Sequence, residues 1–118
     1  GRLSAYCGAV SAGAAAGAGI AYLCGGGYEE VIHTVVNALA IVSGMVCDGA
    51  KASCAAKIAS SVDAGILGYN MYLRGQQFYA GDGIVTKGVE ATIQNIGRLG
   101  KDGMKETNEE IIKMMISD

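Results

Sequence analysis

The sequence predicts an all-α fold, a single compact bundle of about five helices around a central helix rich in glycine and alanine. The chain of 118 residues contains 19 glycines and no proline, so glycine must make the breaks between helices. Apolar residues recur at spacings of three and four from Tyr28 to the C-terminus, whereas the alternation typical of strands is scarce. Hydrophobic residues make up 51% of the chain, which lets one domain bury a sizeable core.

The first expected helix covers residues 4–24, consists mostly of small residues and carries no charge. Its length suits a membrane span, which takes about 20 apolar residues. Its glycines lower its hydropathy, however, and no basic or aromatic flanks frame it as they frame membrane spans. We therefore favour a buried central helix over a membrane span. In either setting Gly13 and Gly17, four residues apart, let another backbone approach closely.

Glycines 25–27 end that helix, and a second helix is expected over residues 28–43. Glu29 and Glu30 lie in its first turn, where negative charge stabilises the positive end of the helix dipole. A third helix is expected over residues 52–73. Apolar residues recur along this third helix at helical spacing, namely Ile58, Val62, Ile66, Tyr69 and Leu73.

Two further helices are expected in the C-terminal third of the chain. Thr86 is suited to cap a fourth helix that runs to Leu99. Thr107 and Glu110 fit the capping box of a last helix, in which each side chain satisfies a backbone N–H of the other residue. The buried face of this last helix should contain Ile111, Met114 and Met115. The methionine pair either fills the core or forms a docking surface for a segment outside this chain.

Composition and charge exclude some classes of function. A net charge of −2 and a pI near 5.3 give no electrostatic footprint for nucleic acid. Four cysteines could form two disulfides, but an apolar chain of this size does not need them, so we expect reduced thiols in the cytoplasm. The chain starts without methionine, which suggests a piece of a longer protein with Gly1 as a cloning remnant.

Residues 44–57, GMVCDGAKASCAAK, are the most informative stretch of the chain. Cys47 and Cys54 flank an acidic turn and lie near Lys51 and Lys57. Nearby cations and the backbone N–H groups of a helix start favour a thiolate, which is the form that binds metals. This turn can therefore hold a metal. The alternative is that these cysteines are small buried hydrophobes, because the spacing C-x6-C alone is a weak metal signal.

Helix geometry limits which side chains can share a site. Cys7 and Cys24 would lie about 25 Å apart on one unbroken helix, and fourteen helical residues would separate His33 from Cys47 by about 21 Å. We therefore interpret His33 as a structural helix residue. Cys47 and Cys54 would be about 10 Å apart on a straight helix, so they face one site only if a loop over residues 48–50 folds them together. Cys7 would have to join them by tertiary packing.

Several blocks of sequence together resemble a known family. They are the stretch from residue 44 onward, GDGIV at 81–85, NIGRLG at 95–100, GMKET at 103–107 and the early Cys7-Gly8 pair. In combination they resemble the C-terminal part of the serine dehydratase α-chain-like family, which includes the uncharacterised UPF0597 proteins and the L-cysteine desulfidases. The resemblance covers nearly the whole chain, and the combination is specific where each block alone is not.

The resemblance implies an oxygen-sensitive [4Fe–4S] cluster held by Cys7, Cys47 and Cys54, with Cys24 not a ligand. Three protein ligands leave one iron open to act as a Lewis acid. In such enzymes that iron binds the β-hydroxyl of L-serine or the β-thiol of L-cysteine while a base removes the α-proton. The products are pyruvate and ammonia, with sulfide from cysteine, and pyridoxal phosphate is not required.

Departures from the family pattern leave the substrate open. Gly49-Ala50-Lys51 stands where classical L-serine dehydratases have proline and glycine, so the chain looks closer to the desulfidase and UPF0597 branch. Three residues, Lys51, Ser53 and Lys57, are candidates to bind a substrate carboxylate, or they only solvate the loop and the helix start.

The same resemblance implies a partner, because family chains are several times longer than this one. No residue here is a convincing general base, so a missing N-terminal portion of the same protein should supply it, and this piece alone should be inactive. Residues 1–118 would then be the C-terminal cluster-bearing domain, acting on a small amino acid without nucleic acid or membrane, and self-association stays open. The alternative is a non-catalytic helical packing or interaction module with buried cysteines.

Overall fold

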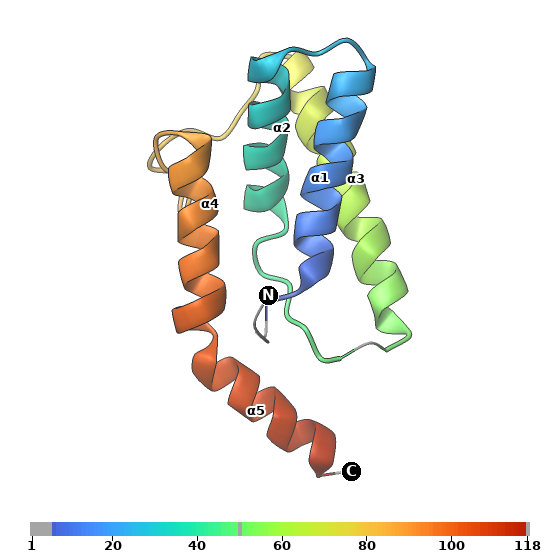
Figure 1. Cartoon of the computed structure of the whole chain (residues 1–118), viewed down its shortest axis with the longest axis vertical. Helices are drawn as coiled ribbons and strands as arrows, with labels where there is room; N and C mark the ends of the chain where they lie inside the picture. Colours follow the sequence, from blue (N-terminus) through green and yellow to red (C-terminus); the bar gives the residue numbers. More distant parts are fainter. Residues whose placement is uncertain (1–5, 50, 118) are drawn as a thin grey trace.

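The computed structural model describes residues 6–49 and 51–117, which form five α-helices and one short π-helical turn (Figure 1). In chain order the elements are α1 (Gly8–Leu23), α2 (Tyr28–Ile41), α3 (Ser53–Leu73), α4 (Val89–Arg98), the π-helical turn η1 (Leu99–Gly103) and α5 (Lys105–Ile116). The β pairing within the described residues is limited to one isolated antiparallel bridge between Tyr6 and Val46. The all-α prediction is confirmed.

Helices α1, α2 and α3 pack against one another as a three-helix bundle. Figure 1 shows that α1 and α3 run in the same direction, with their N-termini at one end of the bundle, while α2 runs in the opposite direction. Helix α1, which is rich in glycine and alanine, packs against both α2 and α3. None of the helices in the described part of the chain combines the length and apolar character that crossing a membrane requires.

Glycine brings the backbones of these helices into direct contact. A Cβ atom added at Gly17 of α1 would lie 2.7 Å from the Cα of Gly65 in α3. A Cβ added at Gly68 of α3 would lie 3.0 Å from the carbonyl oxygen of Thr34 in α2. The close approach that the sequence predicted for Gly13 and Gly17 is confirmed, and the facing residues on α3 are Ser61 and Gly65.

The large apolar residues of α3 do not all lie on its buried face. Ile58, Ile66 and Leu73 are 50%, 39% and 58% exposed, although they recur at helical spacing. The buried side of α3 instead carries mostly small residues, namely Ser61, Ala64, Gly65, Gly68 and Tyr69. Close backbone contact with α1 and α2 leaves no room there for branched side chains.

A buried asparagine joins α2 to the segments beyond it. Asn37 is fully buried, and its Nδ2 donates to the carbonyl oxygen of Gly68 at 3.0 Å. The backbone N–H of Phe78 donates to Asn37 Oδ1 at 3.1 Å. Both ends of the amide are therefore satisfied, as a buried polar group requires. The loop after α3 is thus fixed against α2, on which α4 also packs.

Helix α4 starts later than the sequence suggested, so the prediction that Thr86 caps it is wrong. Gly88 occupies the N-cap position with φ of +93°, a backbone conformation that favours glycine. Thr86 instead lies in the turn before the helix, where its N–H donates to Oγ1 of the buried Thr92 at 3.2 Å. The Thr92 side chain of α4 therefore binds the turn, and no side chain of the turn caps α4.

The last helix is present, but the predictions for its cap and its buried face are wrong. The helix begins at Lys105 and follows η1 directly, so Thr107 lies inside it and forms no capping box with Glu110. No described residue of α5 is buried, and Met114 and Met115 are 66% and 46% exposed. Helix α5 projects from the bundle (Figure 1). The radius of gyration, 14.8 Å, accordingly exceeds the value of about 13.5 Å for a compact chain of this length.

Alanine at Gly17 and alanine at Gly19 should change stability in opposite directions. At Gly17 the new methyl group would meet the backbone of Gly65, which cannot rotate away, and the expected loss is about 1–3 kcal/mol. At Gly19 nothing lies within 4 Å, so better helix propensity should stabilise the chain by about 0.5–1 kcal/mol. Urea unfolding followed by circular dichroism measures both. Equal effects of the two substitutions would contradict the α1–α3 contact.

Candidate metal centre

The isolated bridge at the start of the chain places Cys7 beside Cys47. The backbone N–H of Cys7 donates to the carbonyl oxygen of Met45 at 3.2 Å, next to the antiparallel bridge between Tyr6 and Val46. In this register the side chains of Cys7 and Cys47 leave the same face as diagonal neighbours. In a regular ladder such neighbours lie about 7–8 Å apart.

A tight turn then returns the chain from Cys47 to Cys54. Gly49 has φ of +91°, which an L side chain rarely adopts, and its carbonyl oxygen accepts from the N–H of Lys51 at 2.9 Å. The N–H of Cys54 donates to the carbonyl oxygen of Lys51 at 2.9 Å, and Cys54 lies in the first turn of α3. The loop therefore folds the two cysteines toward one site, as the sequence analysis required.

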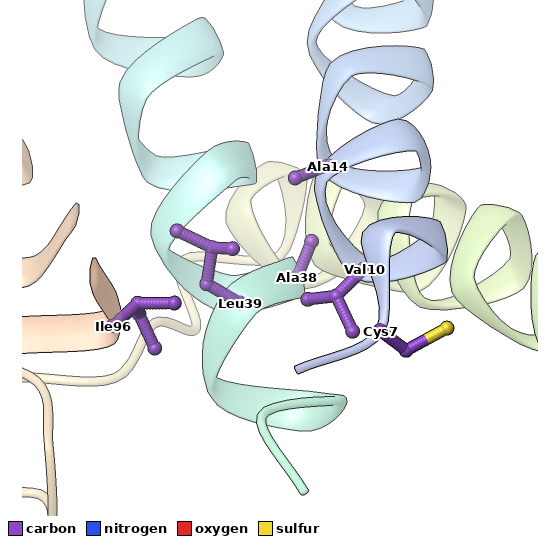
Figure 2. Close-up of a cluster of buried hydrophobic side chains, with 6 residues drawn as sticks. All are labelled: Cys7, Val10, Ala14, Ala38, Leu39 and Ile96. Atoms are coloured by element: carbon purple, nitrogen blue, oxygen red, sulfur yellow. The ribbon is translucent and has the colours of Figure 1, made fainter. Parts of the chain in front are cut away.

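All three cysteines line one cavity of about 320 Å³ at the end of the bundle where α1 and α3 begin. Cys7 is the N-cap residue of α1 and is 4% exposed. Figure 2 shows it at the edge of the buried apolar cluster, with its sulfur directed away from Leu39 and Ile96. The rest of the cavity lining is small or apolar, namely Gly8, Ala9, Ala12, Gly49 and Ile58.

Positive charge and the positive ends of two helix dipoles lie near the cysteine cavity. Both α1 and α3 direct the positive ends of their dipoles toward this end of the bundle. Lys57, one turn after Cys54, donates from Nζ to Asp48 Oδ1 at 2.8 Å and to the carbonyl oxygen of Val46 at 3.0 Å. The pKa of Lys57 is raised, chiefly by its hydrogen bond to Asp48 and also by the nearby Cys7 and Cys54.

The neighbours of the cysteines titrate away from their usual ranges. The hydrogen bond from Lys57, together with its charge, lowers the pKa of Asp48, so this carboxylate is ionised at neutral pH. Burial raises the pKa of Tyr6, and Cys7 next to it adds to the effect. Neither group is therefore poised to exchange a proton near pH 7.

Two other candidate ligands lie outside this cavity. Cys24 is exposed and forms the C-cap of α1, at the opposite end of that helix from Cys7. His33 lies on α2, where its ring stacks on Tyr72 with centroids 5.1 Å apart and its Nε2 lies 3.1 Å from Glu29 Oε2. His33 is thus engaged within the helices, in agreement with its interpretation as a structural residue.

The described residues contain no ready-made site for a single metal ion. Among residues 6–49 and 51–117, no group of three or more His, Cys, Asp or Glu side chains is close enough to hold a metal ion. A single zinc ion would require its sulfur ligands to lie about 4 Å apart. A cluster of several irons is larger, and thiolates spread around a cavity of this size suit it better. The donor set and the cavity therefore fit a polynuclear centre.

Comparison with known proteins identifies the family. The pattern of the family described as "Serine dehydratase alpha chain" matches residues 1–113. The chain belongs to this family. Three relatives, all called UPF0597 proteins, come from Desulfitobacterium hafniense, Lachnoclostridium phytofermentans and Treponema denticola. These relatives are 70%, 58% and 52% identical to this chain over 99%, 99% and 100% of the chain's length, respectively. The resemblance noted in the sequence is thus confirmed.

The chain spans 27–28% of the length of these relatives. No solved structure matches this member of the serine dehydratase alpha chain family.

Sequence reasoning missed two features of the site. The bridge between Tyr6 and Val46 is too short to leave an alternating pattern. The pair of Lys57 and Asp48 was also missed, because the two residues are nine apart and belong to different elements. The available signal was the position of Lys57 three residues after Cys54, which puts both on one face of a helix.

Thiol labelling should rank the cysteines by their exposure. In the folded, reduced chain Cys24 should react fastest with a disulfide reagent, Cys7 slowest, and Cys47 and Cys54 between them, because Cys7 is buried and Cys24 exposed. Mass spectrometry of timed samples measures each rate, and labelling in urea gives the unfolded reference. If Cys7 reacted as fast as Cys24 in the folded chain, the described position of Cys7 would be wrong.

Proposed function

We propose that this chain is the C-terminal, cluster-bearing domain of a longer β-elimination lyase. Its substrate is L-serine or L-cysteine, and its products are pyruvate and ammonia, with sulfide from cysteine. The observation that carries the proposal is the convergence of Cys7, Cys47 and Cys54 on one cavity, in a chain of the serine dehydratase alpha chain family. None of the four cysteines forms a disulfide, which is compatible with the reducing cytoplasm.

Cys7, Cys47 and Cys54 would hold a [4Fe–4S] cluster as thiolates. When bound, the cluster supplies a Lewis acid that stabilises the developing charge on a hydroxide or thiol leaving group. The chain supports the three thiolates with the N-termini of α1 and α3 and with the ammonium of Lys57. The other residues that line the cavity are small or apolar, so the three cysteines are the metal-binding side chains of its described lining.

Two exposed residues beside Cys54 are proposed to bind the substrate carboxylate. Lys51 and Ser53 lie just before and at the start of α3, where a carboxylate also meets the positive end of the helix dipole. Lys57 donates to Asp48 and Val46, so one of the three N–H bonds of its ammonium remains for this purpose. A charged and polar rim around apolar walls suits a small amino acid.

The proton that leaves the α-carbon needs a base from elsewhere. Within the described residues, Asp48 is a poor base because its pKa is lowered by Lys57. His33 stacks on Tyr72 and does not line the cysteine cavity. The relatives are several times longer than this chain, and we propose that a corresponding portion provides the base and completes the carboxylate site. The 118-residue chain alone is then inactive.

One observation favours a second function. Large apolar side chains on α3 and α5 are exposed, among them Leu67, Leu73 and Ile116. Such exposure is typical of surfaces that pack against other protein. A non-catalytic packing module would use these surfaces and would need no metal, so iron binding separates the two functions.

Replacement of single cysteines by alanine should identify the ligands. Cys47→Ala and Cys54→Ala should abolish cluster binding after anaerobic reconstitution, and Cys7→Ala should impair it strongly, because each removes one thiolate from the cavity. Cys24→Ala is the matched control and should keep the wild-type content of iron and acid-labile sulfide. Equal iron loss in all four variants, or no iron in the wild type, would contradict the proposed function.

A further inference from the structure

A single ammonium group binds both neighbours of Cys47. Lys57 Nζ donates to the carbonyl oxygen of Val46, the residue before Cys47, at 3.0 Å, and to Oδ1 of Asp48, the residue after it, at 2.8 Å. The Lys57 side chain is only 21% exposed. Because Lys57 lies on α3 one turn after Cys54, these bonds tie the loop that carries Cys47 to the helix that carries Cys54.

The loop has a second tie to α3, which metal binding would break. The thiol of Cys54 donates to the carbonyl oxygen of Gly49, with sulfur and oxygen 3.4 Å apart. A thiolate ligand has lost the proton that this bond needs, so the bond cannot persist once Cys54 binds a metal. The bonds from Lys57 use no thiol proton and remain. In a loaded site the bonds from Lys57 therefore remain as the hydrogen-bonded connection between the loop and α3, in addition to the link that a shared cluster would make.

We propose that Lys57 is a positioning residue that fixes the Cys47 loop on α3 and offsets the negative charge of the cysteine thiolates. The role of Lys57 in fixing the loop rests on the geometry of the metal-free chain. Its role in offsetting charge rests on the proposed iron–sulfur function. One cation therefore lies one turn after Cys54 on α3 and is bound to the residues on either side of Cys47.

This role differs from a general contribution to stability. Partly exposed ion pairs add little to the global free energy of folding, and Asp48 is 46% exposed. Loss of Lys57 should therefore leave the melting curve nearly unchanged while the loop opens more often. Local opening is visible in amide hydrogen exchange even where global unfolding is not affected.

Hydrogen exchange in the metal-free chain tests the loop-fixing part. Lys57→Met should speed exchange of the amides in residues 45–51 by about tenfold. Lys57→Arg keeps a charged donor and should stay close to wild type, while Lys101→Met removes an exposed lysine from η1 and is the matched control for charge. Asp48→Asn, which keeps an acceptor but loses its charge, should give an intermediate rate. Unchanged loop exchange in Lys57→Met, with the fold intact by circular dichroism, would overturn the proposal.

The reduction potential of the reconstituted cluster tests the charge-offsetting part. Lys57→Met should shift it to a more negative value, because the reduced cluster carries one more negative charge and loses a nearby cation. Lys57→Arg and Lys101→Met should leave it close to wild type. A potential unchanged in Lys57→Met would overturn the charge role. If the wild type takes up no iron, the proposed function fails, and the exchange rates still decide the loop-fixing role.

Discussion

The contact between the backbones of α1 and α3 is the constraint on which the cysteine cavity depends. Gly17 and Gly65 lie so close that a single methyl group would not fit between them. Because the two helices run in the same direction, this contact brings their N-termini to one end of the bundle (Figure 1). Cys7 and Cys54 lie at these N-termini, and the bridge of Tyr6 with Val46 adds Cys47. Helix packing thus determines where the thiols meet.

The same contact explains which parts of the fold could be predicted. Helix positions followed from glycine breaks and apolar spacing, and the close approach at Gly13 and Gly17 followed from their separation. The buried face of α3 could not be predicted from its large residues, because a glycine contact selects small ones and leaves Ile66 exposed. The start of α4 and the exposure of Met115 depend on tertiary context that local capping patterns do not contain.

The cysteines of the candidate site could be proposed from the sequence, but the residues that hold these cysteines in place could not. The family resemblance selected Cys7, Cys47 and Cys54, whereas the spacing of the thiols alone left a metal site and buried hydrophobes both open. The structure brings these three cysteines to one cavity. The two bonds from Lys57 to the neighbours of Cys47 could not be predicted, because they depend on how the loop meets α3. Residues that orient ligands are often found only once the backbone path is known.

The most direct test of the proposed centre is the Mössbauer spectrum of the chain reconstituted with ⁵⁷Fe without oxygen, recorded before and after addition of a small thiol. Three cysteine ligands predict a [4Fe–4S] signal in which about one quarter of the iron, the iron without a protein thiolate, changes its parameters on addition of the thiol. A spectrum without iron–sulfur signals, or one in which no iron responds to the added thiol, would contradict the assignment of Cys7, Cys47 and Cys54 as the three ligands of an open cluster.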